Sequence, residues 1–303
     1  MIMKKGIFIE IDGVFAGGGV KGFAYVGAIE ELERENIHFK RVAGTSAGAI
    51  VAAFIAAGIN SKEMRSYLGE LDRKLIRDEQ KIVQKLPFLK WLRLYKKLGL
   101  YKGASLERWL ESKLAQKGIF TFADLEPGVL KIVASDLTNG EIVVLPDDLK
   151  KFGIDENHFS VAKAIRMSCS LPFFYEPVCL SGNGRKALIV DGGVLSNFPI
   201  WLFQQSISDR PVIGFQLTSG NKIMANGEIN NGVQLVEALF KTMKDAHDRR
   251  YIEKQLAKQI IFLPVDELVS TLDDQIDEAM VEKLINIGQE RTRSYLMQWT
   301  RVW

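Results

Sequence analysis

Short apolar runs alternate with longer segments of helical spacing along most of the chain. The runs are rich in Val, Ile, Leu and Phe, a composition typical of buried strands. In chain order they are Gly6–Val14, Phe39–Ala43, Val129–Ser135, Glu141–Leu145, Ala187–Val190, Pro211–Thr218 and Gln259–Pro264. This alternation predicts an α/β fold, a three-layer α/β/α sandwich with a mostly parallel central sheet.

Composition indicates one globular domain. The chain has 303 residues, 47% of them hydrophobic, which is enough to bury a substantial core in a single domain spanning 1–303. The part from about 232 to 303 is mainly helical, and we expect its last helix, Asp273–Trp303, to pack on the sheet. A net charge of only +3 and the lack of a recognisable DNA- or RNA-binding motif argue against nucleic acid as a partner.

Two features bear on the location of the protein. Glu10 and Asp12 interrupt the apolar N-terminal stretch, which argues against a secretory signal. No run approaches the ~18 apolar residues of a membrane span. We therefore expect a cytoplasmic protein in which Cys169 and Cys179 are reduced thiols, with Cys169 packed among small residues.

A serine stands at a corner flanked by glycines, in the segment Gly44-Thr45-Ser46-Ala47-Gly48. A strand is predicted before it and a buried helix, Ala49–Ala57, after it. Glycines on both sides allow a sharp turn that holds the hydroxyl above the sheet, as in a G-x-S-x-G nucleophile elbow. An ordinary strand–helix turn in which the serine caps the helix remains the alternative.

A glycine-rich loop, Gly17–Gly22, follows the first predicted strand and precedes a helix predicted from about Gly22 to Arg34. Such a loop lets the backbone approach a ligand and leaves amides free to bind an oxyanion. The loop also satisfies G-x-G-x-x-G, but the acidic residue that a dinucleotide site needs about 20 residues on is missing. A phosphate-binding Walker loop is excluded because no G-K-[ST] follows.

A third motif, Asp191-Gly192-Gly193, follows the short predicted strand Ala187–Val190. An aspartate after the carboxyl end of a strand lies where open α/β sheets place their ligand sites. The simpler interpretation is a tight turn that begins with Asp.

Together the three motifs resemble those of the patatin-like phospholipases, which carry G-G-G-x-[RK]-G, G-x-S-x-G and D-G-[AG] in this order. The resemblance runs from about Ile7 to Thr218. It includes Met167–Pro172, which is similar to the small-residue segment ending in proline that the family has ahead of the aspartate. The family's fold also resembles that of the malonyl-CoA:carrier-protein transacylases.

The resemblance implies a lipid acyl hydrolase that acts on phospholipids or lysophospholipids through a covalent acyl-enzyme, without a cofactor or metal. Ser46 would be the nucleophile and Asp191 its base. The implied site residues are the oxyanion loop Gly17, Gly18, Gly19, Lys21 and Gly22, the elbow glycines Gly44 and Gly48, and Gly192 and Gly193 of the third motif. Amides of Gly18 and Gly19 would hold the oxyanion, while Lys21 would either favour an anionic headgroup or cap a neighbouring carbonyl. Alternatives are an acyltransferase using the same acyl-enzyme, and a membrane-binding module with weak esterase activity.

The few histidines agree with a serine–aspartate dyad. His38, His158 and His247 are the only ones in the chain, and none follows a predicted strand in a loop marked by Gly or Pro. We expect all three to be surface residues rather than the catalytic base.

The segment from Gln80 to Leu106 is basic and apolar, with seven cationic side chains and no acidic one. The cationic residues are Lys81, Lys85, Lys90, Arg93, Lys96, Lys97 and Lys102. Basic charge interleaved with Trp91, Tyr95 and several leucines is typical of a helix at an anionic lipid interface. A structural cap with solvated lysines is the other interpretation. The lipid-interface interpretation predicts that residues 80–106 make peripheral contact with the inner face of the membrane.

Overall fold

The computed structural model describes residues 8–71, 73–78, 94–204, 210–218, 256–265 and 277–299, and the single positions 229, 235, 238, 239, 242 and 243. His247 and residues 80–93 of the basic segment lie outside the described residues. Among the helices that are described, none is both long and apolar enough to cross a membrane.

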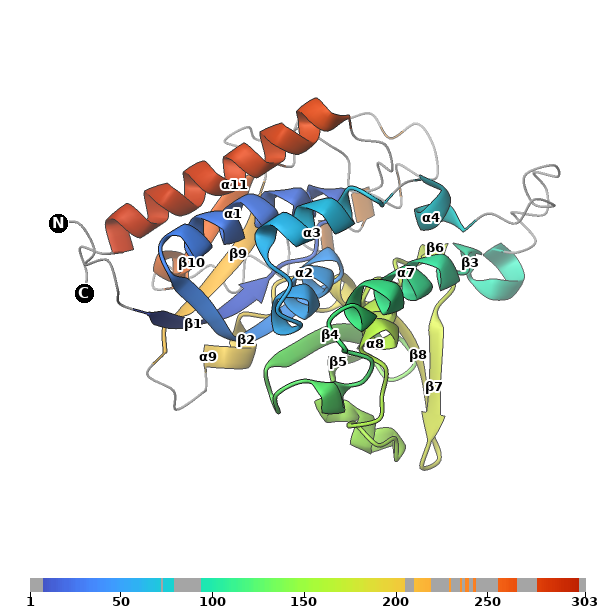
Figure 1. Cartoon of the computed structure of the whole chain (residues 1–303). Helices are drawn as coiled ribbons and strands as arrows, with labels where there is room; N and C mark the ends of the chain where they lie inside the picture. The colour runs from blue at the N-terminus through green and yellow to red at the C-terminus, as the bar shows by residue number, and fades with distance from the viewer. Residues whose placement is uncertain are drawn as a thin grey trace.

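An eight-stranded sheet forms the centre of the molecule, in the order β10-β9-β1-β2-β4-β8-β7, with β5 also paired to β4 (Figure 1). The strands are β1 (Ile9–Phe15), β2 (Ile37–Thr45), β4 (Leu130–Asp136), β5 (Glu141–Leu145), β7 (Val178–Gly182), β8 (Arg185–Asp191), β9 (Val212–Thr218) and β10 (Ile260–Pro264). Pairing is parallel from β10 to β4, whereas β5, β8 and β7 pair antiparallel. The mostly parallel sheet is as predicted, and β7 is a strand that the sequence pattern missed.

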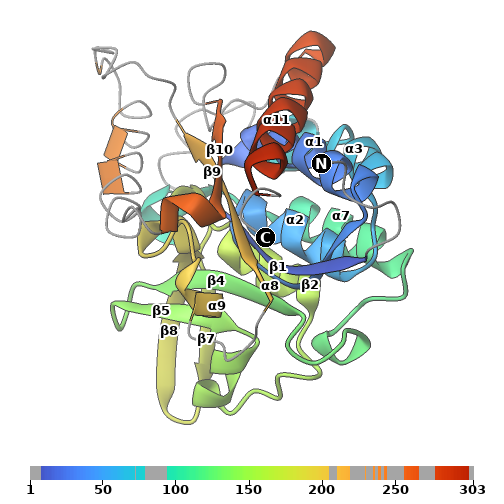
Figure 2. The same cartoon turned by 90° about the vertical axis from the view of Figure 1, so that its left-hand side faces the viewer.

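Helices cover the sheet (Figure 2). The α-helices are α1 (Phe23–Arg34), α2 (Ala47–Ala56), α3 (Ser61–Leu68), α4 (Arg73–Arg77), α7 (Ala104–Ala115), α8 (Val161–Ser168), α9 (Trp201–Gln204) and α11 (Glu278–Trp299). Five 3-10 turns are described: η1 (Gly19–Gly22), η2 (Phe122–Asp124), η3 (Asp147–Phe152), η4 (Gly192–Val194) and η5 (Leu256–Gln259). A second small sheet pairs β3 (Gly99–Tyr101) with β6 (Phe173–Tyr175).

The two faces of β1 enter different hydrophobic cores. Ile11 and Phe15 belong to the larger core, which includes α1, α2 and α11. Val14 packs instead with Phe203 of α9 in a smaller cluster. Side chains alternate between the faces of a strand, so a strand covered on both faces is largely apolar, as in β1 apart from Glu10 and the buried Asp12.

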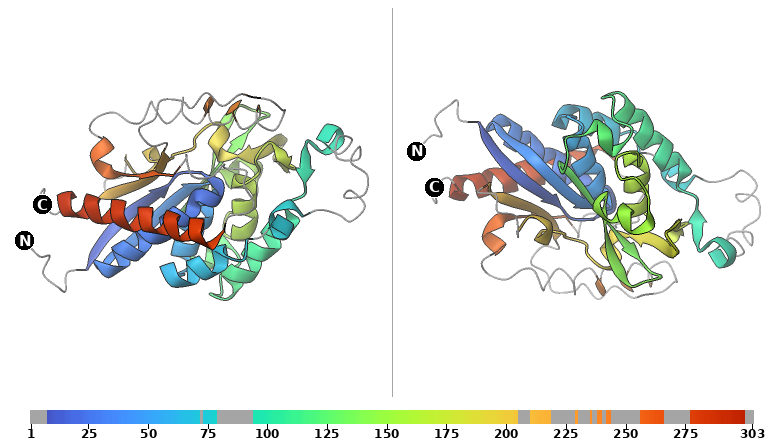
Figure 3. Two further views of the ribbon diagram at one scale, coloured as in Figure 1. Left: turned by 90° about the horizontal axis from the view of Figure 1, so that it is seen from above. Right: turned by 90° about the horizontal axis from the view of Figure 1, so that it is seen from below.

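The last helix packs on the sheet strand β10, as predicted for Asp273–Trp303, and also closely along the neighbouring helix α1. Figure 3 shows α11 running along α1 above the strands. Gly27 and Gly288 make this close approach possible, because a Cβ on either would collide with a backbone carbonyl of the facing helix. Arg293 of α11 also donates to the buried Glu31 of α1 at 2.8 Å.

Candidate active site

The serine and aspartate motifs meet because two strands share one edge of β4. Thr45, at the end of β2, pairs in parallel with Val133. Asp191, at the end of β8, pairs antiparallel with Ala134, the next residue of β4. The other edge of β4 is occupied by β5. The carboxyl ends of β2 and β8 therefore face each other, and the chain leaves each strand at the same place (Figure 1).

Ser46 lies at the sharp corner that the glycine pattern predicted. Its backbone has φ 54° and ψ −125°, a conformation that favours glycine, and it connects β2 directly to α2. A Cβ on Gly44 would collide with the Gly48 carbonyl, and one on Gly48 would collide with the carbonyls of Phe15 and Ala16. Both flanking glycines are thus required. Gly44 has no room for a side chain because the turn brings it against Gly48, and Gly48 has none because it lies against the backbone at the end of β1.

The backbone of Ser46 is tied on both sides. Its N–H donates to the Ser168 hydroxyl at 2.8 Å, and Ser168 in turn donates to the Val133 carbonyl at 2.6 Å. Its carbonyl accepts from the Ala49 N–H at 2.8 Å, as the first bond of α2. The fully buried Ser168 therefore links the corner to the β4 residue that pairs with Thr45.

Asp191 is buried, with 5% of its surface exposed, and its carboxylate accepts from the Gly193 N–H at 2.7 Å. The side chain of Ser46 lies beside the same carboxylate. Burial raises the pKa of Asp191 to about 6, because the ionised form is poorly solvated, while the Gly193 N–H and the Ser46 side chain act in the opposite direction. The result is a carboxylate of increased basicity in contact with a serine hydroxyl.

The glycine-rich loop lies against the corner. A Cβ on Gly17 would be 3.2 Å from the Ser46 Cβ, and the Gly17 N–H is already bonded to the Asn197 carbonyl at 3.1 Å. A Cβ on Gly18 would collide with the Leu217 side chain, and Gly19 has φ 59°. The amide of Gly17 is thus occupied, which leaves those of Gly18 and Gly19 as the candidate oxyanion donors.

The remaining residues of the first and third motifs have structural positions nearby. Gly22 ends η1, and Lys21 within it is buried. A Cβ on Gly192 would collide with the Val133 carbonyl, which explains why glycine follows the aspartate.

Neither described histidine approaches Ser46. His38 is the second residue of β2 and stacks on Phe8 with ring centroids 4.4 Å apart. Ser46 follows the opposite end of that strand, ~25 Å away at the usual rise per residue. His158 is 82% exposed and pairs with Asp155. Among the described residues, Ser46 and Asp191 are therefore the candidate catalytic pair.

Three residues around the candidate pair were not predicted from the sequence as part of the site. Ser168 holds the corner, Cys169 lies beside the Ser46 side chain, and the Ser170 carbonyl accepts from the Asp191 N–H at 2.9 Å. Cys169 was expected only to pack; it is buried, which raises its pKa, but it also contacts the nucleophile. The similarity of Met167–Pro172 to a family segment was the one signal that could have found them.

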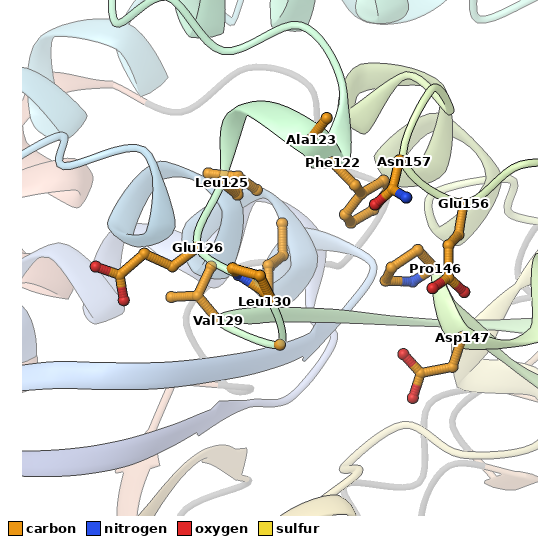
Figure 4. A pocket seen from close by; sticks show the side chains of 12 residues that line it. Phe122, Ala123, Leu125, Glu126, Val129, Leu130, Pro146, Asp147, Glu156 and Asn157 are labelled. Carbon is orange, nitrogen blue, oxygen red and sulfur yellow. The ribbon is translucent and has the colours of Figure 1, made fainter.

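A hollow of about 280 Å³ lies elsewhere, beside the start of β4 (Figure 4). Its lining includes Leu125 and Val129 and the carboxylates of Glu126 and Asp147. These carboxylates are already paired, Glu126 with Lys40 and Asp147 with Lys131. The carboxylate of Glu156 also lines the hollow, but no serine, cysteine, histidine or lysine does, so the hollow offers no nucleophile. Within the described part of the chain, His, Cys, Asp and Glu side chains form no cluster that could bind a metal ion.

The sequence profile of the patatin-like phospholipases matches residues 13–203, which include all three motifs. The chain belongs to this family. Membership of this family supports lipid ester hydrolase activity for the protein.

Relatives extend the similarity beyond the matched region. YqhO of Bacillus subtilis, an uncharacterised protein, is 50% identical over 96% of this chain and 99% of its own length. A cUMP-AMP-activated phospholipase of Escherichia coli is 25% identical over 60% of this chain and 54% of its own. In the ExoU–SpcU complex of Pseudomonas aeruginosa, a chain with 19% identity superposes with a TM-score of 0.54, covering 95% of this chain and 51% of that one. The last comparison shows that the patatin-like fold is shared.

We expect Ser46→Gly to be more stable than Ser46→Ala by ~1 kcal/mol, because glycine relieves the unfavourable backbone conformation at the corner. Urea unfolding of the two variants measures the difference. The same pair of changes at Ser112, inside α7, provides the control: there alanine should be the more stable by ~1 kcal/mol. If the same variant, glycine or alanine, were the more stable one at both positions, the result would contradict backbone strain at Ser46.

We expect Ser168→Ala to lower kcat by roughly 10- to 100-fold with little change in KM, because the corner loses the hydroxyl that holds the Ser46 amide. The buried groups left unpaired should also lower stability by ~1–3 kcal/mol. Ser181→Ala, at an exposed position of β7, is the control and should change neither. A stability loss with unchanged kcat would make Ser168 a purely structural residue.

Proposed function

We propose that this patatin-like phospholipase hydrolyses carboxylic esters of phospholipids or lysophospholipids with Ser46 as nucleophile and Asp191 as base. The observation that carries the proposal is the position of the Ser46 side chain beside a buried carboxylate, Asp191, whose pKa burial raises to about 6. A solvated aspartate, with a pKa near 4, would be a much weaker base. At neutral pH the buried carboxylate is still mostly ionised, so it can accept a proton.

In the first half of the reaction, the Ser46 Oγ attacks the ester carbonyl carbon while its proton passes to the Asp191 carboxylate. The carbonyl oxygen becomes an oxyanion, for which the Gly18 and Gly19 amides are the proposed donors. One such donor is typically worth ~3 kcal/mol in the transition state. The start of α2, immediately after Ser46, adds favourable dipoles for negative charge. The intermediate collapses to an acyl-enzyme as Asp191 returns the proton to the leaving alcohol oxygen.

In the second half, a water molecule attacks the acyl-enzyme carbonyl. Asp191 accepts the water proton, the same donors hold the second oxyanion, and the proton returns to the Ser46 Oγ as the fatty acid leaves. An alcohol that replaced the water would give acyl transfer from the same intermediate. Analysis of products with and without an added glycerol or lysolipid acceptor separates the two outcomes.

Lipid esters are the proposed substrates because the chain belongs to the patatin-like phospholipases and bears similarity to a phospholipase of Escherichia coli. Such substrates are held in bilayers, so the protein must reach a membrane surface to act on them. Action at the inner face of the cytoplasmic membrane stays a prediction of the sequence.

We expect Ser46→Ala and Asp191→Asn each to lower hydrolysis of a soluble p-nitrophenyl ester by at least about 1,000-fold with the fold retained by circular dichroism. His38→Ala, His158→Ala and His247→Ala should keep most of the activity. Asp155→Asn, which removes an exposed carboxylate, is the control for Asp191→Asn. A fluorophosphonate probe should label wild type once, at Ser46. Undiminished labelling of Ser46→Ala, or loss of activity in a folded histidine variant, would contradict the dyad.

The pH profile of kcat/KM for the same soluble ester should reflect Asp191. The carboxylate must be ionised to accept the serine proton, so activity falls about ten-fold per pH unit below its pKa and levels off above it. Because burial raises that pKa to about 6, the rise should be centred near that value rather than near 4. A profile already flat at about pH 5 would mean that the base is not this buried carboxylate.

A further inference from the structure

The small sheet of β3 and β6 holds large apolar side chains in solvent. Tyr95 is 84% exposed, Leu98 49% and Phe173 52%. Gly99 pairs with Phe173, so Leu98, the residue before Gly99, is adjacent to Phe173 across the pair. Segments more than 70 residues apart in the chain thus place their apolar side chains at one corner, which lies at the end of the molecule away from the termini (Figure 1).

Two of these residues have an unusual backbone. Leu98 has φ 61° and Phe173 has φ 66°, in the left-handed region that bulky side chains rarely adopt. Backbone bonds hold both turns, with the Leu98 N–H donating to the Leu94 carbonyl at 3.0 Å and the Phe174 N–H to the Leu171 carbonyl at 3.1 Å. The fold therefore keeps Leu98 and Phe173 exposed at a conformational cost, which burial in the free protein does not offset. Such outliers point to function.

Positive charge surrounds the apolar residues. Lys96, Lys97 and Lys102 are exposed, and no acidic residue occurs from 94 to 106. The nearby carboxylate of Asp78 accepts from the Ala104 N–H at 3.1 Å and the Ser105 hydroxyl at 2.9 Å, so it is used in holding the start of α7. The corner thus combines three exposed apolar side chains with three exposed lysines that neighbour them in the chain or through the β3–β6 pairing.

We propose that this corner, formed by Tyr95, Lys96, Lys97, Leu98, Lys102 and Phe173, docks the protein on the surface of an anionic lipid bilayer. Apolar side chains would enter the headgroup region while the lysines contact anionic lipid, the arrangement that favours interfacial binding. A protein partner fits less well, because a stable interface needs ~800 Å² from each side and three side chains provide only part of that. The proposal rests on the proposed function, since the bilayer is also the source of the ester.

The corner is connected to the catalytic pair through a short segment. Phe173 is four residues beyond Cys169, which contacts Ser46, so their Cα atoms are at most ~14 Å apart. Arg166 clamps the two regions together: its guanidinium donates to the Ser170 Oγ at 2.6 Å and to the carbonyls of Lys102 at 2.5 Å and Gly103 at 3.1 Å. A bilayer docked on the corner would therefore lie close to Ser46.

The test measures co-sedimentation with phosphatidylcholine vesicles, with and without phosphatidylserine, in a Ser46→Ala background so that binding is read without hydrolysis. Leu98→Asn combined with Phe173→Asn removes the apolar groups, and asparagine tolerates the left-handed backbone, so the variant should fold. We expect its partition onto vesicles with phosphatidylserine to fall about ten-fold or more. Changing Lys96, Lys97 and Lys102 together to Gln should weaken binding to vesicles with phosphatidylserine but not to those without it. The salt dependence of binding to the phosphatidylserine vesicles should also disappear.

The matched control is Phe120→Asn combined with Leu137→Asn, which removes the same two residue types at similar exposure, 60% and 47%, on other loops. It should bind like the parent. Unchanged binding in the corner variant, an equal loss in the control, or no binding by the parent would overturn the proposal. A second assay separates failure of the docking surface from failure of the proposed function: hydrolysis of the soluble ester by wild type and by the corner variants with Ser46 restored. If wild type does not cleave that ester, the proposed function fails. If the ester is cleaved normally and vesicle binding is unaltered in the corner variants, only the docking surface is refuted.

Discussion

The whole site depends on the pairing of β4 with two strands along one edge. Val133 and Ala134 are neighbours in β4, and they set the positions of Thr45 and Asp191. Because one strand runs parallel to β4 and the other antiparallel, both carboxyl ends arrive at the same point. Hydrogen bonding within the sheet thus brings together two motifs that are about half the chain apart. A shift of either strand by one residue would turn the catalytic side chain to the opposite face.

Each member of the candidate pair, Ser46 and Asp191, is held in place at an energetic cost. It raises the pKa of Asp191, which increases its basicity, while the Gly193 N–H and the Ser46 side chain limit the rise and keep the carboxylate available at neutral pH. At Ser46 the corner geometry presents the hydroxyl at the expense of an unfavourable backbone conformation. Both features reduce stability, and such costs are common in active sites.

The predictable parts of the structure are those with a local cause. Gly44 and Gly48 mark the corner because the turn itself excludes a Cβ, and the apolar runs mark strands covered on both faces. Ser168 and Cys169 could not be assigned, because their contacts with Ser46 follow from where α8 packs against β4 rather than from their own neighbours in sequence. The strand β7 was missed since it lies at the sheet edge, where burial is partial. In the basic segment the pattern indicated Tyr95 and Lys97, but Phe173 joins them only through the β3–β6 pairing.

The clamp at Arg166 has a consequence for how this family can vary. The buried guanidinium of Arg166 donates hydrogen bonds to three backbone carbonyls and has no carboxylate partner among them. This arrangement needs the planar group of arginine with its several N–H donors, which lysine does not provide. Gly103 belongs to the same arrangement, because a Cβ there would collide with the guanidinium. The two positions are therefore expected to change together among homologues: wherever residue 103 gains a side chain, the arginine should be lost, and the orientation of the lysine-bearing corner should diverge with it.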